Sequence, residues 1–598
     1  MNPAPNPGRR RSRAGRRFLL VTGAALLLVA GAAEIPSARA RAGDDSAALV
    51  QEANRKVRQK DTAGAIQLLQ RAIAADPANV DAHVRYQDLA RSAVGLPQIQ
   101  RQYSDAAKAK PDDAVAQFLA VRLLPAEQAV DEFKKLASRF ADSPWPCAGL
   151  ARASEALRKF GDAAVAHADA IRRAGAGATR FEAFRAYGFE QQGDWAQAVD
   201  AWKAIVPKTP KDLSARFGLA EALRKNGQLD EALVALDEAA KVGAAEPELA
   251  YRRGLVHFDA GRWDKALESF DASIGLDRGM IESYCAGCET AILQAYATAD
   301  AAKRDVTEKD FEKATGYGER AVITDPESAY AHFVLGAAYE AAGELNMSPD
   351  QLDPAVKQYD AALERLPIPG PDKVRVLTAK AWVLILKSSW DGALDAAQRA
   401  IDIDPKCAVA YGHAGYALAG MGKQQDAIAK YYKKGLAIDP RNARISHDMG
   451  IAYRELKKPL DAKKPLEDAV SWEPKNGRYH LSLGELYYEL KKNKEAAQEL
   501  FEATEALPRS EDAWRAYGRA CYSAKSWEEC ARAYEKVVGL FPEAKTEHLI
   551  LAVVYAEQLK DKTKAKAHAT KFRENGGSDP NLDDWLSQLL ADATGNKP

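Results

Sequence analysis

Residues 477–510 read GRYHLSLGELYYELKKNKEAAQELFEATEALPRS, and this stretch decides the fold. Its apolar residues recur at the i, i+3, i+4 and i+7 spacing that forms one face of an α-helix. Gly484 and Ala496 are small residues at which two antiparallel helices can approach closely, and Leu483 and Tyr487 belong to the same helix face. Pro508 ends the second helix because proline lacks an N–H group and clashes with the preceding turn. The stretch therefore predicts a helical hairpin.

The same pattern recurs about every 34 residues along the chain. Copies begin at residues 46, 80, 113, 145, 179, 213, 247, 281, 329, 374, 408, 443, 477, 511 and 545. The two copies that flank the quoted one carry the same landmarks, namely Met449, Gly450, Tyr453, Ala462, Ala469 and Pro474 before it, and Trp514, Tyr517, Gly518, Tyr534 and Pro542 after it. One hairpin cannot bury its own apolar face, so neighbouring hairpins must stack.

These landmarks resemble those of the tetratricopeptide repeat, whose signature is W-x2-L-G-x2-Y, then A-x3-F-x2-A, then P. The resemblance extends over about nine-tenths of the chain and is weakest in the first four copies, where the Gly and Tyr landmarks are mostly missing. It implies an all-α, right-handed superhelical solenoid of about fifteen helix-turn-helix repeats.

Two insertions interrupt the period, around residues 297–310 and 345–353. Thr307 and Asp310 have the spacing of a capping box that opens a helix, and Ser348 to Gln351 (SPDQ) shows the same order with a first-turn proline. The proline-rich segment 366–371 is interpreted as a seam between two arrays. The expected organisation is a signal peptide at 1–42, arrays at 43–370 and 371–580, and a capping helix and tail at 581–598.

The N-terminus has the plan of a secretory signal peptide. Six arginines lie within the first 17 residues, an uncharged apolar run spans residues 18–33, and A-x-A sites predict cleavage near Ala40 or Ala42. The predicted location is periplasmic or secreted; the alternative is an uncleaved inner-membrane anchor, which would be the chain's only membrane contact. The full chain has 84 basic and 84 acidic residues, and removal of residues 1–42 leaves 76 and 83, a net charge of −7. An acidic protein does not attract phosphate backbones, which argues against a nucleic-acid partner.

Signatures of catalysis are missing from the sequence. No G-x-S-x-G or H-E-x-x-H spacing occurs, and the segment 420–424 (GMGKQ) lacks the first Gly and the Ser/Thr of a phosphate-binding loop. No stretch outside the repeats is long enough for a catalytic core. We therefore expect no enzymatic activity, no cofactor and no metal site.

The resemblance implies that partners bind in the concave groove, lined by positions 2, 5, 9 and 12 of each first helix. The candidates at these positions are Phe217, Tyr251, Leu255, Phe258, Tyr330, Phe333, Trp382, Ile385, Tyr416, Tyr488 and Tyr522. Aromatic residues dominate binding hot spots, although the same residues could instead pack the superhelix. The Lys and Asn that clamp a chaperone's C-terminal carboxylate in some repeats of this kind are not present at these positions. Arg515 and Arg519, one turn apart, could receive an anionic group or form a solvated face.

The six cysteines allow several interpretations. Cys285 and Cys288 form a C-x-x-C motif inside a first helix, which fits small packing residues, a local disulfide, or redox or metal chemistry. Cys521 and Cys530 are predicted on facing helices, where a disulfide requires Cα atoms within about 7 Å.

Together these features predict a non-catalytic scaffold of the bacterial cell envelope that binds proteins or peptides of an envelope complex. The alternatives are an inner-membrane-anchored assembly factor and a thiol-redox module that uses the C-x-x-C pair.

Overall fold

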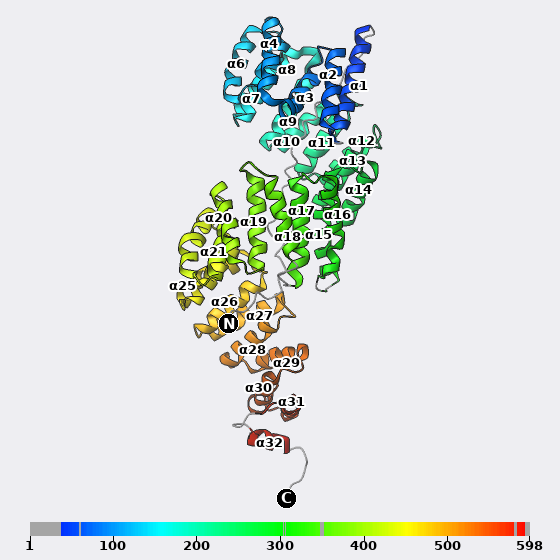
Figure 1. The fold of residues 1–598 in the computed structure, drawn as a ribbon. Coiled ribbons are helices and arrows are strands. Elements are labelled where there is room, and N and C mark those ends of the chain that lie inside the picture. Colours follow the sequence, from blue (N-terminus) through cyan, green and yellow to red (C-terminus); the bar gives the residue numbers. More distant parts are fainter. Residues whose placement is uncertain are drawn as a thin grey trace. The chain divides into compact units, whose positions relative to one another are not determined.

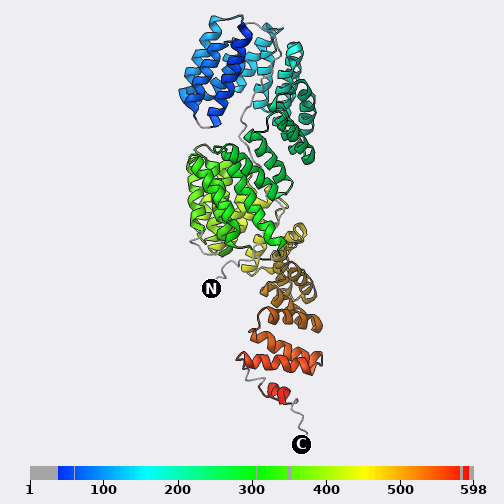
Figure 2. The same ribbon diagram turned by 90° about the vertical axis from the view of Figure 1, so that its right-hand side faces the viewer.

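The computed structural model describes residues 38–58, 61–302, 304, 306–346, 352–578 and 583–591. Within these ranges the chain is helical and contains no β-strand. The described residues fall into two compact units that divide between Ala338 and Tyr339, inside helix α17 (Ala329–Asn346). Figures 1 and 2 show that the helices within each unit pack as successive hairpins. This arrangement confirms the predicted all-α repeat fold.

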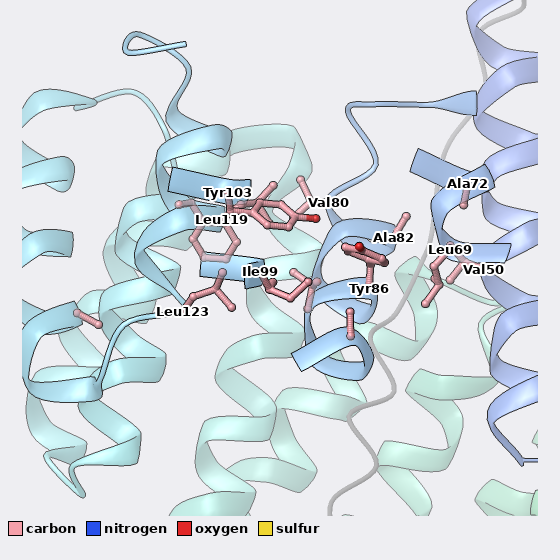
Figure 3. Packing of buried hydrophobic residues seen from close by; sticks show 14 of the residues in the cluster. Val50, Leu69, Ala72, Val80, Ala82, Tyr86, Ile99, Tyr103, Leu119 and Leu123 are labelled. Atoms are coloured by element: carbon pink, nitrogen blue, oxygen red, sulfur yellow. The ribbon is translucent and has the colours of Figure 1, made fainter. Parts of the chain in front are cut away.

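The first unit contains eight hairpins and the start of α17. Their helices are α1 (Ala38–Arg58) and α2 (Thr62–Ala75), α3 (Val80–Ala90) and α4 (Leu96–Ala109), α5 (Ala114–Val121) and α6 (Ala126–Arg139), α7 (Trp145–Ala156) and α8 (Phe160–Ala174), α9 (Ala178–Gln192) and α10 (Trp195–Ile205), α11 (Leu213–Lys225) and α12 (Leu229–Ala240), α13 (Pro247–Asp259) and α14 (Trp263–Leu276), and α15 (Ile281–Ala301) and α16 (Glu312–Thr324). Buried apolar residues join neighbouring hairpins, as Figure 3 shows for Val50, Leu69, Tyr86, Ile99 and Leu119.

The second unit continues with the same design. After α18 (Asp353–Glu364) come α19 (Pro371–Leu386) and α20 (Trp390–Ile403), α21 (Ala408–Gly420) and a helical segment over 424–438, α24 (Ala443–Glu455) and α25 (Pro459–Trp472), α26 (Gly477–Glu489) and α27 (Asn493–Ala506), α28 (Glu511–Ala524) and α29 (Trp527–Leu540), and α30 (Lys545–Val553) and α31 (Lys562–Glu574). Helix α32 (Asp583–Ala591) then covers the last hairpin, where Leu586 packs against Ala552, Ala569 and Phe572.

The predicted repeat starts agree closely with the first helices. All but two fall within one residue of a helix start; α1 begins at Ala38 rather than 46, and α19 begins at Pro371 rather than 374. The segment 366–371 lies within the second unit, between α18 and α19. Residues 1–37, Ser348–Gln351 as a predicted helix start, and Pro580 lie outside the described residues.

Close helix packing explains the small residues of the pattern. A Cβ atom on Gly484 would lie 2.5 Å from Leu500 Cγ on the second helix of the same hairpin. Gly254 faces Phe270 and Gly518 faces Tyr534 in the same way. A larger residue at this position would have to displace its partner, and dense protein interiors tolerate such changes poorly.

The first insertion lengthens α15 to 21 residues, so that this helix continues beyond the normal repeat. The predicted capping box is formed, because Asp310 accepts a hydrogen bond from the Thr307 backbone N–H at 2.7 Å. Arg304 donates to the same carboxylate at 2.6 and 2.8 Å, and these contacts hold the pKa of Asp310 well below its usual range.

A recurring hydrogen bond ties five of the hairpins to the turn before them. His83, His332, His480 and His548 bond through Nε2 to the carbonyl oxygens of Pro77, Pro326, Pro474 and Pro542, at 2.9 to 3.2 Å. Trp514 donates to the Pro508 carbonyl at 3.0 Å from the same repeat position. The histidines that seem scattered in the sequence thus include a periodic structural set, each six residues after a proline.

None of the helices among the described residues combines the length and the apolar character that crossing a bilayer requires.

Candidate functional site

The predicted groove residues differ widely in exposure. Phe217, Tyr251, Phe333 and Trp382 are buried, with 3–7% of their surface exposed, and Leu255 and Ile385 are buried as well. Phe258, Tyr330, Tyr416, Tyr488 and Arg515 are partly buried, whereas Arg519 and Tyr522 are exposed. The buried members are therefore part of the packing between repeats, the alternative that the sequence left open for them, and they are not free to contact a partner directly.

Aromatic rings in the first unit lie against charged neighbours. The Arg252 guanidinium lies 5.3 Å from the centre of the Phe217 ring. Tyr330 stacks on Phe333, and its hydroxyl donates to Glu289 Oε1 at 2.7 Å. Burial raises the pKa of Tyr330 well above its ordinary value. These contacts fix the rings in place and use their polar atoms within the protein.

In the second unit, Trp382 is likewise held in place by polar and charged neighbours. Its Nε1–H donates to Glu344 Oε1 at 2.8 Å, its ring stacks on His413, and the Arg444 guanidinium lies 4.1 Å from the ring centre. One tryptophan on α19 thus links α17, α21 and α24.

The predicted arginine pair does not offer two available cations. Arg515 forms ion pairs with Glu511 at 2.7 Å and with Glu547 at 2.8 Å, so its charge is already compensated. Arg519 is exposed. Tyr522 is 44% exposed and packs edge-on against Trp527 at 5.3 Å. Arg519 and Tyr522 are the most exposed of the predicted residues.

A network of buried charges follows the first helices α9, α11 and α13. The Arg224 side chain, 3% exposed, donates to Glu221 at 2.6 and 2.9 Å and to Asp259 at 2.5 Å. Arg252 bonds to Glu248 at 2.8 Å. Glu190 accepts a hydrogen bond from Trp202 Nε1 at 2.6 Å, and burial raises the pKa of this carboxyl to about 7.

A pocket lies between α3, α5, α7 and α9 of the first unit. Its volume is about 20 Å³, space for roughly one water molecule, and its lining is Val80, Asp81, Val84, Phe118, Arg122, Trp145, Ala148, Arg152 and Phe184. The Phe118 and Trp145 rings lie 5.2 Å apart. Asp81 is paired with Arg180, a residue 99 positions away in the chain. The sequence analysis missed this site because it lies in the copies where the repeat landmarks are weakest.

The cysteine thiols are all free in this structure, and the predicted Cys521–Cys530 bridge is not formed. Burial raises the pKa of Cys521 to about 11 and that of Cys530 to about 12. Cys285 and Cys288 are fully buried, and burial raises both thiol pKa values well above their ordinary value. The pair therefore lacks the exposed, low-pKa thiolate that thiol exchange uses.

The described ranges contain no group of three or more His, Cys, Asp or Glu residues arranged to hold a metal ion.

Comparisons with known proteins agree with the helical hairpins. A family model of the tetratricopeptide repeat matches residues 185–245, 225–281, 350–408 and 447–511. These four segments are thus similar to tetratricopeptide repeats. It is similar to the small glutamine-rich tetratricopeptide repeat-containing protein 2 of Mycosarcoma maydis, with 29% identity over 117 residues. That match includes 20% of this chain and 32% of the relative, so the chain spans about a third of the relative's length.

Two solved structures show similarity at low identity. The Cut9–Hcn1 hetero-tetramer of APC/C matches with 13% identity and a TM-score of 0.43, over 92% of this chain and 96% of that one. Yeast Tom70 matches with 13% identity and a TM-score of 0.34, over 69% of this chain and 94% of that one.

Proposed function

We propose that the protein is a non-catalytic scaffold that binds partner proteins or peptides along its first helices, within the bacterial cell envelope. Tetratricopeptide-repeat proteins generally act as protein-interaction scaffolds. The observation that carries the proposal is the repeat itself: from α1 to α31 every described helix belongs to a stacked hairpin. Within each unit, stacked hairpins offer a regularly patterned surface, which suits binding of an extended partner.

Crosslinking in intact cells tests the scaffold function. A photo-crosslinking residue replaces Tyr522, which is exposed on a first helix, and in a matched control replaces Ile323, which is 77% exposed on the second helix α16. We expect the same partner proteins to attach reproducibly at Tyr522 and not at Ile323. Equal attachment at both positions, or none at either, would contradict binding along the first helices.

The envelope location is proposed from the arginine-rich, apolar N-terminal sequence. N-terminal sequencing of the protein from cells tests it. A mature protein that begins at Arg41 or Gly43 supports a cleaved signal peptide. An intact N-terminus in the membrane fraction supports the anchored alternative, and an intact N-terminus in the cytoplasm contradicts both.

A further inference from the structure

Two histidines face each other in the last hairpin. The Nδ1 atoms of His548 on α30 and His568 on α31 lie 3.0 Å apart. His548 is buried, with 5% of its surface exposed, and His568 is partly buried. The His568 ring stacks on Tyr555, whose hydroxyl donates to Glu535 of α29. The two imidazoles therefore form a direct hydrogen-bonded link between the two helices of the hairpin.

The second contact of His548 determines where the hydrogens lie. Its Nε2 bonds to the Pro542 carbonyl oxygen at 3.2 Å, and because a carbonyl oxygen only accepts, Nε2 carries a hydrogen. In the neutral ring Nδ1 is then an acceptor, so the hydrogen between the two rings belongs to His568 Nδ1. The lone pair that this bond leaves unused lies on His568 Nε2.

The pair can accept one proton and keep its bond, but it cannot accept two. The first proton enters at His568 Nε2, and the bond between the Nδ1 atoms remains. A second proton would occupy His548 Nδ1, so that two N–H groups and two positive charges would face each other across 3.0 Å. Both effects push the rings apart, whereas the unfolded chain accepts both protons at about pH 6.5.

The charged groups around the pair do not relieve this conflict. Lys571 and Lys564 of α31 add positive charge beside the first and the second ring, respectively. The neighbouring carboxylates are engaged elsewhere, since Glu535 bonds to Lys564 at 3.1 Å and Glu547 of α30 bonds to Arg515 at 2.8 Å. Burial is the main reason that the pKa of both histidines is lowered.

The equivalent contact has a different chemistry in two other repeats. His480 faces the Glu499 carboxylate, and His83 faces the Tyr103 hydroxyl, in each case 19 or 20 residues further along the chain. A carboxylate accepts from the doubly protonated ring, and a hydroxyl can donate or accept, so protonation of the histidine breaks neither contact. Of these three contacts, the one in the last hairpin is thus the one that acid breaks.

We propose that His548 and His568 form an acid-sensitive switch, which holds the last hairpin closed at neutral pH and releases it in acid. Release separates α30 from α31 and uncovers the apolar residues that join these helices to α32, namely Ala552, Ala569, Phe572 and Leu586. Because the hairpin lies at the end of the array, it can open locally while the preceding hairpins stay folded. The switch goes beyond the proposed scaffold function and does not depend on it.

Hydrogen exchange of the full chain tests the switch, with protection factors corrected for intrinsic rates. Histidines whose pKa is lowered on folding contribute stability that is full above the unfolded pKa of about 6.5 and is lost as pH falls below it. We expect protection in α30 and α31 to fall at least about fivefold from about pH 7 to about pH 5. Protection in α26 and α27, which contain His480 and Glu499, should persist over the same range and serves as the internal reference.

Two substitutions at His568 separate the switch from general effects of acid. In His568→Gln an amide faces His548 Nδ1, and because an amide can turn to donate or to accept, the fall in protection should disappear. His568→Glu recreates the arrangement of His480 and should reverse the dependence, so that protection falls as pH rises above about 6.5. His83→Gln is the matched control, since His83 lies outside the last hairpin, and it should preserve the parent's fall in α30 and α31.

Circular dichroism at about pH 7 checks that each variant folds, and if His568→Gln does not fold, the dependence in His568→Glu decides. Protection in α30 and α31 that is unchanged or higher in acid would overturn the proposal. An equal fall in α26 and α27, a fall that persists in His568→Gln, or one that His83→Gln abolishes would overturn it as well.

Discussion

The imidazole of His480 bonds through Nε2 to the carbonyl oxygen of Pro474 at 2.9 Å. Its other ring nitrogen, Nδ1, lies 2.7 Å from Glu499 Oε2. Both nitrogens therefore face acceptors, an arrangement that only the doubly protonated ring satisfies fully. Because Glu499 stabilises the charged form, the pKa of His480 is raised. The same residue thus joins α26 to the preceding turn and to α27.

We expect the stability of this hairpin to depend on pH. A raised histidine pKa contributes stability that is fully present below the unfolded pKa of about 6.5 and is lost as pH rises through the folded value. Protection factors from hydrogen exchange in α26 and α27, corrected for intrinsic rates, should therefore fall as the pH rises above about 6.5. Glu499→Gln should flatten this dependence, whereas Glu505→Gln, at an exposed position of α27, should preserve it. An unchanged slope in Glu499→Gln would contradict the charged pair.

We expect the stability of the first unit to depend on pH in a similar way, through Glu190. Its pKa of about 7 means that the folded protein favours the neutral carboxyl. Stability from this group is full below the unfolded pKa of about 4.3 and is lost as pH rises through 7. Glu190→Gln keeps an acceptor for Trp202 and removes the titration, so the parent's loss of protection in α9 and α10 should disappear. Glu182→Gln, on the same helix, serves as control, and a persistent loss in Glu190→Gln would assign the effect elsewhere.

Most first helices among the described residues are followed by a residue with positive φ. Gly193, Gly227 and Gly261 occupy this place in three repeats, but Lys491 adopts it with φ of 62°. A residue with a side chain loses roughly 1–2 kcal/mol of stability in the left-handed backbone conformation. Glycine avoids this cost, but it loses more conformational entropy on folding, which cancels part of the gain. Lys491→Gly should therefore stabilise the hairpin by about 0.5–1 kcal/mol, seen as slower hydrogen exchange in α26 and α27. Lys494→Gly, inside helix α27, should cost about 1 kcal/mol.

Gly484 is predicted to tolerate no larger side chain. Its missing Cβ would lie 2.5 Å from Leu500, so Gly484→Val should destabilise the hairpin by about 1–3 kcal/mol. Gly539 on α29 has open space around it, and Gly539→Ala should gain up to about 1 kcal/mol through helix propensity. Thermal unfolding of the two full-length variants gives the comparison. If the Gly484→Val protein unfolds at the same temperature as the parent, α26 and α27 can move apart without loss of stability.

The 34-residue period and the helix starts could be predicted because they depend on local pattern, as Gly484, Ala496 and Pro508 illustrate. Burial of the groove residues depended on contacts between repeats. Trp382, for example, is covered by Arg444, which lies 62 positions along the chain. The periodic histidines had an available signal, a histidine six residues after a proline, that the sequence analysis did not use.

The ion pairs around the pocket could not be predicted from such local patterns. Glu155 bonds to His167 and Asp88 bonds to Arg122, although Arg152 lies near both acids. Each of these acids could, from the sequence alone, equally have paired with Arg152. Which pairing forms depends on contacts between helices, which no local pattern encodes.

The bond from the first helix to the preceding proline carbonyl gives the hairpins that have it their own connector. Residues 477–510 begin after the Asn476 cap and Pro474, and the next copy begins after the Ser510 cap and Pro508, so both junctions present the same chemistry. A gene segment that encodes one such module can be duplicated or deleted in frame, and the new junction would still find its cap and its carbonyl acceptor. Length in this protein is thus an adjustable quantity, set by the number of modules rather than by a fixed core.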